Sequence, residues 1–573
     1  MSKHVEKKRN ESRGLLNWIE RMGNRLPDPV SLFVLGAIGV VILSQVADSL
    51  DWTVTKTVLA PVMKPVIDSG TGEPIEILQM DPDGTIRRSA DGETVRSQVV
   101  VTPVEDVETG KAEQEQAKQE VRATGLLTRD GLNWAISSMV KNFVNFPPLG
   151  VVLVGMLGIG VAEKTGAIGT LLKAAMLVTP QRLLTPSMVF VGVMSSMALD
   201  AGYIILPPVA AALYKAVGRS PLVGLAAVFS GVSAGFSANL LPTGLDPLLA
   251  GFTESGAQVL DPTYRVAATC NWWFMIASTI MLTLVGWAVT AWFVEPRYAS
   301  KTPSEGGPVE HQESEDSTKL TADERRGLSA ATVGFLVAFG ILMVMILYPG
   351  APLYGRGARF ARWVEAIVPI LFLMFLVPGI LYGVAVGKIR SDRQTAKLMS
   401  ETMADMGPYI VLAFFAAQFI EYFKFSKLGE MLAIVGGQTL ANANLPTGAL
   451  LIAFVLVVMV ANLFIGSASA KYAFLAPVFI PMFMAEGVNI SPELTQAAYR
   501  VGDSVSNVVA PLNPYIIIVL VFIQRYVPKA GIGTLISLML PYSIAFFVIW
   551  SIMLVLWIQT GVNLGPGGPL TYP

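Results

Sequence analysis

The sequence predicts an all-α polytopic membrane protein, and two features of its composition lead to this fold class. Hydrophobic residues make up 53% of the 573 residues and charged residues only 14%, against about 25% charged in soluble domains. The charges are also segregated: residues 1–28, 48–131, 295–326 and 388–405 hold 56 of the 83, which leaves 27 for the other 411 residues. Such segregation is typical of aqueous loops that alternate with apolar spans.

The same composition excludes several classes of function. A net charge of −1 without a long basic face argues against a nucleic-acid partner. Cys270 is the single cysteine, so no intramolecular disulfide can form. His4 and His311 both lie in charged segments, which argues against a histidine-based metal centre in the membrane and against haem or catalytic zinc. We therefore expect no cofactor and no metal beyond a coupling Na⁺.

Charge placement predicts how the chain enters the membrane. Residues 1–28 carry seven basic and four acidic residues, so this tail should be cytoplasmic, followed by an uncleaved first helix at 29–47. Residues 48–131 carry 16 acidic and 9 basic residues and should be an extracytoplasmic loop, either a small cap or a solvated insertion. Within it, the β-branched run Val99–Val101 predicts one arm of a short hairpin.

Further apolar spans are predicted downstream, several of them short or interrupted by Gly and Pro. The basic loop 388–400 should be cytoplasmic and the uncharged tail 560–573 extracytoplasmic. The predicted organisation is a first transport repeat at 132–295, a cytoplasmic linker at 296–326, two connecting helices at 327–387 and a second transport repeat at 388–559.

An internal repeat is visible in two independent patterns. Pro148, Lys164 and Gly169 recur 260 residues later as Pro408, Lys424 and Gly429. Asn239 and the triplet Leu245-Asp246-Pro247 recur as Asn507 and Leu512-Asn513-Pro514, at offsets of 268 and 267. The first copy follows the acidic outer loop and the second follows the basic inner loop, so the copies should be inverted. Inverted repeats with broken helices are the architecture of secondary transporters, with the substrate site near the midplane.

Four Gly- and Pro-rich breaks lie deep in apolar segments, where unpaired backbone requires a cavity lined by protein. They span Ser195–Pro207, Ser237–Pro247, Asn462–Pro477 and Tyr499–Pro514. Five ionisable residues fall within them: Asp200, Asp246, Lys471, Arg500 and Asp503. A charge at bilayer depth costs about 2.5–3.5 kcal/mol on the insertion scale, so each needs a partner or a wet cavity.

These residues suggest roles. Arg500 and Asp503 are three apart on a helix face, so they either pair with each other as a structural salt bridge, or Arg500 binds a substrate carboxylate while Asp503 titrates or orients it. Asp200, with no charged neighbour within four residues, suits a proton-carrying or cation-binding role.

Neutral oxygens in the breaks could serve a Na⁺ site. The candidates are Asn239, Asn462, Gly466, Asn507 and Asn513; the alternative is that these asparagines cap the broken helices. Tyr472 either stacks on an aromatic ligand or lines the core.

Six motifs resemble the AbgT family of p-aminobenzoyl-glutamate transporters. They are FPPLGVVLVGMLGIGVAEKTG (146–166), SSMALDAGY (195–203), GVSAGFSANLLPTGLDPLLAG (231–251), IGSASAKYAFLAP (465–477), AAYRVGDSVSNVVAP (497–511) and GIGTLISLMLPYS (531–543). The resemblance runs from about residue 18 to 560, apart from much of 52–125.

The resemblance implies a homodimeric, multi-pass protein of the bacterial inner membrane with nine transmembrane helices and two re-entrant hairpins per subunit. It implies cation-coupled movement of p-aminobenzoyl-glutamate, a folate catabolite, and in some members export of sulfonamide antimetabolites. By motif, Asp200, Ser469, Pro492, Arg500 and Asp503 match positions associated with substrate transport, and Asn462, Gly466 and Asn513 match positions near the cation site. Tyr472 stands where the family is expected to have Trp.

The function predicted is secondary transport of p-aminobenzoyl-glutamate or related aromatic anions and sulfonamides, driven by a Na⁺ or H⁺ gradient. The alternatives are a cation-coupled transporter of another small carboxylate such as a dicarboxylate, an intramembrane enzyme, and a passive channel. An enzyme is disfavoured because the breaks contain no His, no Cys and no evident pair of carboxylates at one site. The residues leave the direction of transport and the choice between Na⁺ and H⁺ open.

Overall fold

The computed structural model describes residues 29–61, 63–65, 76–78, 96–99, 101–103, 114–198, 201–308, 320–510, 513 and 515–573. The described chain separates into two compact units. The larger contains the described residues of 29–50 and 124–573, and the smaller contains those of 51–123.

The larger unit is helical, which confirms the predicted fold class. Its first helices are α2 (Pro29–Ser49), α3 (Arg129–Ser137), α4 (Met139–Val144), α5 (Pro147–Thr165), α6 (Ala167–Leu177), α7 (Leu184–Met194), α8 (Ala201–Ala216), α9 (Pro221–Phe229), α10 (Leu245–Ala257), α11 (Trp272–Val289) and α12 (Glu295–Ala299). The second group is α13 (Ala322–Leu347), α14 (Arg362–Glu365), α15 (Ile367–Ala385), α16 (Asp392–Asp405), α17 (Gly407–Phe425), α18 (Leu428–Asn442), α19 (Thr447–Asn462), α20 (Ala468–Met484), α21 (Pro492–Ser506), α22 (Tyr515–Gln524) and α23 (Ile532–Thr560).

Six described helices are long and apolar enough to cross a membrane: Val30–Ser49, Pro147–Thr165, Trp272–Ala299, Ala322–Leu347, Ile367–Ala385 and Ile532–Thr560. A seventh span results if α16 and α17, bent by 45° at their junction, are counted together. Several other apolar helices are shorter than a bilayer requires. The count of nine transmembrane helices and two hairpins stays a prediction.

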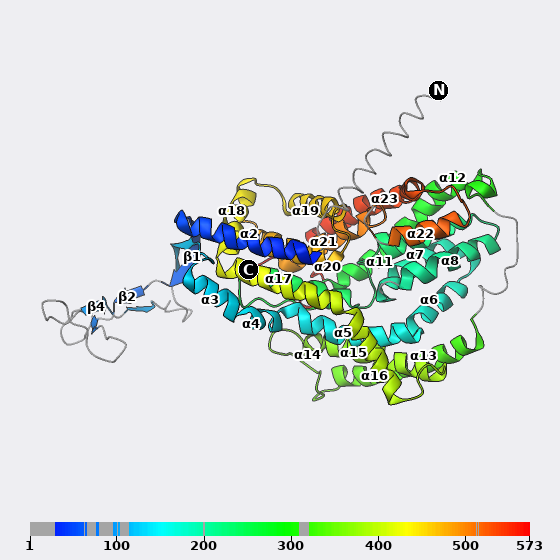
Figure 1. Cartoon of the computed structure of the whole chain (residues 1–573), viewed down its shortest axis with the longest axis horizontal. Coiled ribbons are helices and arrows are strands. Elements are labelled where there is room, and N and C mark those ends of the chain that lie inside the picture. Colours follow the sequence, from blue (N-terminus) through cyan, green and yellow to red (C-terminus); the bar gives the residue numbers. More distant parts are fainter. Residues whose placement is uncertain are drawn as a thin grey trace, which may run out of the picture. The chain divides into compact units, whose positions relative to one another are not determined.

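Helices that are distant in sequence pack side by side. The first helix, α2, lies along α17, and α15 packs against both α5 and α13 (Figure 1). Helix α21 is enclosed by α10, α19, α20 and α23, and every residue from Pro492 to Ser506 is buried. An interior helix of this kind can carry charged side chains only if its neighbours supply partners.

The predicted breaks are real but shorter than the sequence suggested. Between α7 and α8 a 3₁₀ turn at Ser195–Ala198 interrupts the helix, yet α8 continues through Pro207 and Pro208. Helix α20 likewise contains Pro477 and Pro481. Proline is tolerated in helices at membrane depth because neighbouring groups can satisfy the carbonyls it frees.

The fourth predicted break was placed too early. Residues from Tyr499 to Ser506 are helical, and the chain leaves the helix only after Ser506. Helix α21 begins at Pro492, which follows the N-cap Ser491, whose hydroxyl accepts a hydrogen bond from the Leu494 amide. This combination of a Ser cap and a first-turn proline favours a helix start and holds Arg500 and Asp503 in regular helical geometry.

The smaller unit consists of antiparallel strands. They are β1 (Thr53–Pro61), β2 (Met63–Pro65), β3 (Glu76–Leu78), β4 (Arg96–Val99), β5 (Val101–Pro103) and β6 (Gln114–Arg122). They pair as β1–β6, β2–β5 and β3–β4, the nested order of one long hairpin. The arm predicted at Val99–Val101 is present, divided between β4 and β5, while Val100 lies outside the described residues.

Candidate functional site

Four buried charged residues form two ion pairs around α21. Arg500 and Lys471 are among the largest fully buried side chains of the described chain. Asp503 and Asp246 are 1% and 4% exposed. Because breaking a buried pair leaves an uncompensated charge, the partners of these groups decide what the site can do.

Arg500 pairs with Asp246, which lies in the first turn of α10. Arg500 Nη2 donates to Asp246 Oδ1 over 2.7 Å, and Arg500 Nη1 donates to the Ser237 carbonyl over 3.3 Å. The other Asp246 oxygen accepts from Asn239 Nδ2 at 3.1 Å, from the Thr243 amide at 2.6 Å and from Thr243 Oγ1 at 3.1 Å. The carboxylate therefore organises the break 237–244 as well as neutralising Arg500.

Lys471, on α20, pairs with Asp503. Lys471 Nζ lies 2.6 Å from Asp503 Oδ1 and also donates to Asn462 Oδ1. Asn462 Nδ2 in turn donates to the Asp503 carbonyl at 3.0 Å and to Ser506 Oγ at 2.8 Å. This cluster joins the end of α19, the start of α20 and the last turn of α21.

A salt bridge between Arg500 and Asp503, one of the two interpretations of their spacing, is not the arrangement found. Each of the two side chains has its partner on another helix, Asp246 for Arg500 and Lys471 for Asp503. Helical spacing places two residues on one face, but a packed helix offers cross-helix partners that spacing does not reveal.

The predicted cation-binding asparagines divide into two groups. Asn507 Oδ1 accepts from Asn462 Nδ2 at 2.8 Å, and Asn513 Nδ2 donates to the Asn507 carbonyl at 3.1 Å, so these three residues lie together. Asn239 lies instead beside Asp246, and Gly466 is in an exposed position between α19 and α20. Asn513 Oδ1 also accepts from the Tyr515 amide, so at this position the capping alternative describes the contact.

Four buried polar atoms near these pairs lack a hydrogen-bond partner within the described part of the chain. They are Ser237 Oγ, Asn239 Oδ1, Arg500 Nε and Asp503 Oδ2. An unpaired buried polar group is costly, and such groups are concentrated where a ligand can complete them. The ion pairs and these atoms together define the candidate site.

Tyr472 is packed as a core residue in this conformation. Its ring is 0% exposed and lies 4.1 Å from that of Tyr499, centroid to centroid, at an angle of 33°. Its hydroxyl shares a hydrogen bond of 2.7 Å with Thr253 Oγ1. The ring therefore packs against Tyr499 and has no exposed surface on which a ligand could stack.

The other predicted site residues take different positions. Pro492 is buried at the start of α21, away from the charged end of that helix, and Ser469 Oγ lies 3.2 Å from Ser467 Oγ in the first turn of α20. Asp200 lies outside the described residues. The transport roles assigned to all these residues stay predictions.

The sequence identified Asp246 and Lys471 as ionisable residues in the breaks but did not predict their ion pairs. Counting charges could have indicated these pairs, because two buried cations at membrane depth require two anions within reach. The sequence contains three carboxylates in the breaks, and only packing decides which of them pair with the two cations.

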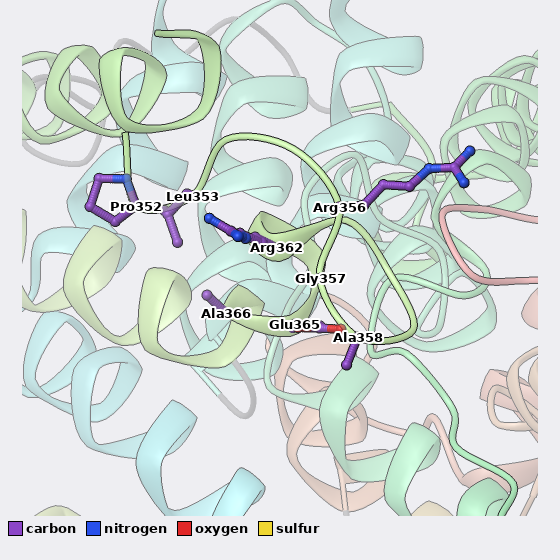
Figure 2. Close-up of a pocket in the computed structure, with 8 residues that line it drawn as sticks. All are labelled: Pro352, Leu353, Arg356, Gly357, Ala358, Arg362, Glu365 and Ala366. Carbon is purple, nitrogen blue, oxygen red and sulfur yellow. The ribbon is translucent and has the colours of Figure 1, made fainter. Parts of the chain in front are cut away.

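The larger unit also has at least two cavities away from the ion pairs. One, of about 460 Å³, has an apolar lining from α5, α6, α13 and α15, including Ile168, Phe335 and Pro378. Figure 2 shows the other, of about 570 Å³, in the segment 352–366, where the side chains of Arg356 and Arg362 extend away from each other. The backbone amides of Arg359 and Phe360 hold the pKa of the Glu365 carboxyl there below its usual range. Neither cavity contains the buried ion pairs.

Comparison with known proteins identifies the family. The sequence model of the AbgT putative transporter family matches residues 14–67 and 94–572. The chain belongs to the AbgT family. It is 31% identical over 561 residues to the p-aminobenzoyl-glutamate transport protein of Escherichia coli K12, with 97% of each chain covered.

Two solved AbgT-family structures are similar over nearly the whole chain. The YdaH transporter of Alcanivorax borkumensis is 36% identical, with a TM-score of 0.78 over 94% of this chain and 100% of that one. MtrF of Neisseria gonorrhoeae, described among a class of antimetabolite efflux pumps, is 35% identical, with a TM-score of 0.78 over 97% and 100%. The chain is therefore a multi-pass membrane transporter rather than an enzyme, and the buried pairs are charges inside an AbgT transporter.

Proposed function

We propose that this AbgT-family chain is a cation-coupled secondary transporter of p-aminobenzoyl-glutamate or related aromatic anions, sulfonamide antimetabolites included. The names of its relatives support this substrate class, since one is a p-aminobenzoyl-glutamate transport protein and another belongs to a class of antimetabolite efflux pumps. The direction of movement depends on the driving gradient and on whether substrate and cation move in the same or in opposite directions.

The observation that carries this proposal is the buried guanidinium of Arg500. It lies where α21 meets the break 237–244, with Nε unpartnered among the described residues. p-Aminobenzoyl-glutamate carries two carboxylates, and a planar guanidinium binds carboxylate through two parallel hydrogen bonds. Stacking on Tyr472 requires the Tyr472–Tyr499 contact to open, so we assign the carboxylates the larger share of recognition.

Coupling to Na⁺ or H⁺ is part of the same proposal. Asn462 and Asn507 direct their oxygens at Lys471 Nζ and at Asn462 Nδ2, so in this conformation they do not fit Na⁺. Asn239 Oδ1, unpartnered in the described chain and beside Asp246, fits a cation better. Asp200 and Asp503 are the proposed proton carriers. We further propose a homodimer in the bacterial inner membrane with a cytoplasmic N-terminus.

The test is transport in proteoliposomes with labelled p-aminobenzoyl-glutamate and with Na⁺ and H⁺ gradients imposed separately, in both orientations. We expect flux that depends on one gradient, competition by unlabelled substrate but not by succinate, and loss of flux in Arg500→Gln. Preference for succinate would instead indicate the dicarboxylate alternative. Transport by Arg500→Gln at the wild-type rate would remove Arg500 from the substrate site.

A further inference from the structure

The Arg500–Asp246 ion pair has a neutral counterpart in the same region. Arg500 lies 267 residues after Ser233, and Asn513 lies 267 residues after Asp246. Asn513 Nδ2 donates to Ser233 Oγ at 3.4 Å, just as Arg500 Nη2 donates to Asp246 Oδ1 at 2.7 Å. Each contact therefore joins the positions that are equivalent, at an offset of 267 residues, to those joined by the other contact.

A third contact lies on the same offset. The Ser237 amide donates to Ser504 Oγ at 3.1 Å, and these two residues are also 267 apart. A two-fold relation between two copies produces this pattern. A residue near the axis contacts its own equivalent in the other copy, and other contacts occur in equivalent pairs. Ser233–Asn513 therefore serves as an internal control for Asp246–Arg500.

The comparison shows that packing does not require the charges. At the counterpart position a neutral hydrogen bond joins the two breaks, while Arg500 and Asp246 join them with two buried charges. A buried ion pair is often no more stabilising than a neutral replacement because desolvation offsets the attraction. The charges of this pair are therefore better explained by what Arg500 binds than by packing alone.

We propose that Asp246 competes with the substrate for Arg500. Its carboxylate occupies Nη2, one of the two N–H positions that would bind a substrate carboxylate, until the substrate displaces it. This inference rests on the proposed function, in which Arg500 receives a substrate carboxylate. Asp246 thereby becomes an affinity-setting residue of the site, which keeps Arg500 neutralised between transport events.

The hydrogen bonds of Arg500 support this order of events. Asp246 takes Nη2 alone, and Nε, the other N–H of the same edge of the guanidinium, is unpartnered within the described residues. An arriving carboxylate can first accept from Nε and then replace Asp246 at Nη2, completing the two-bond geometry that guanidinium favours.

The displaced carboxylate keeps partners of its own. Asp246 Oδ2 accepts three hydrogen bonds, from Asn239 Nδ2 and from the amide and hydroxyl of Thr243. Releasing Oδ1 from Arg500 therefore does not leave Asp246 without donors, which lowers the cost of the exchange.

The experiment measures equilibrium binding to the purified full-length protein in detergent. The probes are p-aminobenzoyl-glutamate, its dimethyl ester, benzoate and succinate. For Asp246→Asn we expect p-aminobenzoyl-glutamate to bind about tenfold more tightly, because one charge-assisted hydrogen bond no longer has to be exchanged. Ester affinity should be unchanged, since the ester carries no carboxylate.

Two further variants make the test specific. Thr243→Val removes one donor to Asp246 with little change of shape and should weaken binding about two- to fivefold, because the displaced Asp246 then keeps fewer donors. Glu295→Gln neutralises another arginine partner, that of Arg219, and should leave affinity at the wild-type value. If Asp246→Asn does not fold, Thr243→Val decides the question alone.

Unchanged or weaker carboxylate binding in folded Asp246→Asn would overturn the inference, as would unchanged or tighter binding in Thr243→Val when that variant stands alone. Equal gains for the ester would do so too, because they would show a general loosening of the site. If wild type prefers benzoate or succinate, the proposed substrate is wrong, and the same variants judge the inference with those anions. Absence of carboxylate binding by every variant overturns both.

Discussion

Lys471 illustrates how strongly a single buried side chain depends on its neighbours. Its ammonium group contacts one carboxylate, that of Asp503, and one amide oxygen, that of Asn462. No part of the side chain reaches solvent in the described structure. A pair of this kind adds little net stability when intact, yet losing one partner costs several kcal/mol because the other charge stays buried.

We therefore expect Lys471→Met to destabilise the folded protein by about 3–5 kcal/mol, since Asp503 loses its cation. The matched control is Lys164→Met, because Lys164 pairs with Asp405 in positions where their side chains are 26% and 62% exposed. That change should cost at most about 1 kcal/mol. Unfolding midpoints of the two variants in the same detergent make the comparison; equal midpoints would show that the Lys471 pair is solvated.

Close packing of helices depends on residues without side chains. Gly192, on α7, and Gly231, in the π-helical turn Ser230–Ala234 that follows α9, face each other where these segments cross. A Cβ at Gly231 would lie 2.7 Å from the Val193 nitrogen and closer still to the Val189 carbonyl. Small residues allow this approach of backbones in membrane proteins, and the turn leads directly into the break 237–244.

Gly231→Val should consequently disrupt the crossing and cost about 1–3 kcal/mol or more, as overpacking does. Its control is Gly340→Val on α13, where a Cβ would meet nothing within 4 Å. Yield of monodisperse protein and thermal midpoint are the measurements. Wild-type behaviour of Gly231→Val would mean that α7 and the turn can separate without penalty.

At the scale of the whole molecule, the smaller unit is an insertion whose ends meet. Thr53 pairs with Arg122 in the β1–β6 ladder, and the Ala123 amide donates to the Trp52 carbonyl at 3.4 Å. The family match is interrupted within this unit, at residues 68–93. A unit that begins and ends at one place can be removed without moving the chain on either side.

Replacing residues 54–121 by a four-residue Gly/Ser linker should leave folding and transport intact, because a short turn closes the same gap. Size-exclusion profiles and proteoliposome flux, compared with full-length protein and with a variant lacking only 68–93, are the readouts. Loss of transport in the larger deletion alone would assign the paired strands a role in the transport cycle.

Several properties follow from the sequence alone, for physical reasons. Segregated charges and long apolar runs specify a helical membrane protein, because lipid leaves backbone groups no other partner than their own helix. Gly- and Pro-rich motifs located the breaks and, within them, the five ionisable residues. The motifs also identified the AbgT family, which the whole-chain comparisons confirm.

Only the tertiary structure decided which charges pair. The spacing of Arg500 and Asp503 was compatible with a bridge between them, whereas packing gives each a partner on another helix. Buried charges choose partners by distance and desolvation in three dimensions, and neither is encoded in local spacing. For the same reason Asp246, 254 residues before Arg500 in the chain, acquires its importance only where α10 and α21 meet.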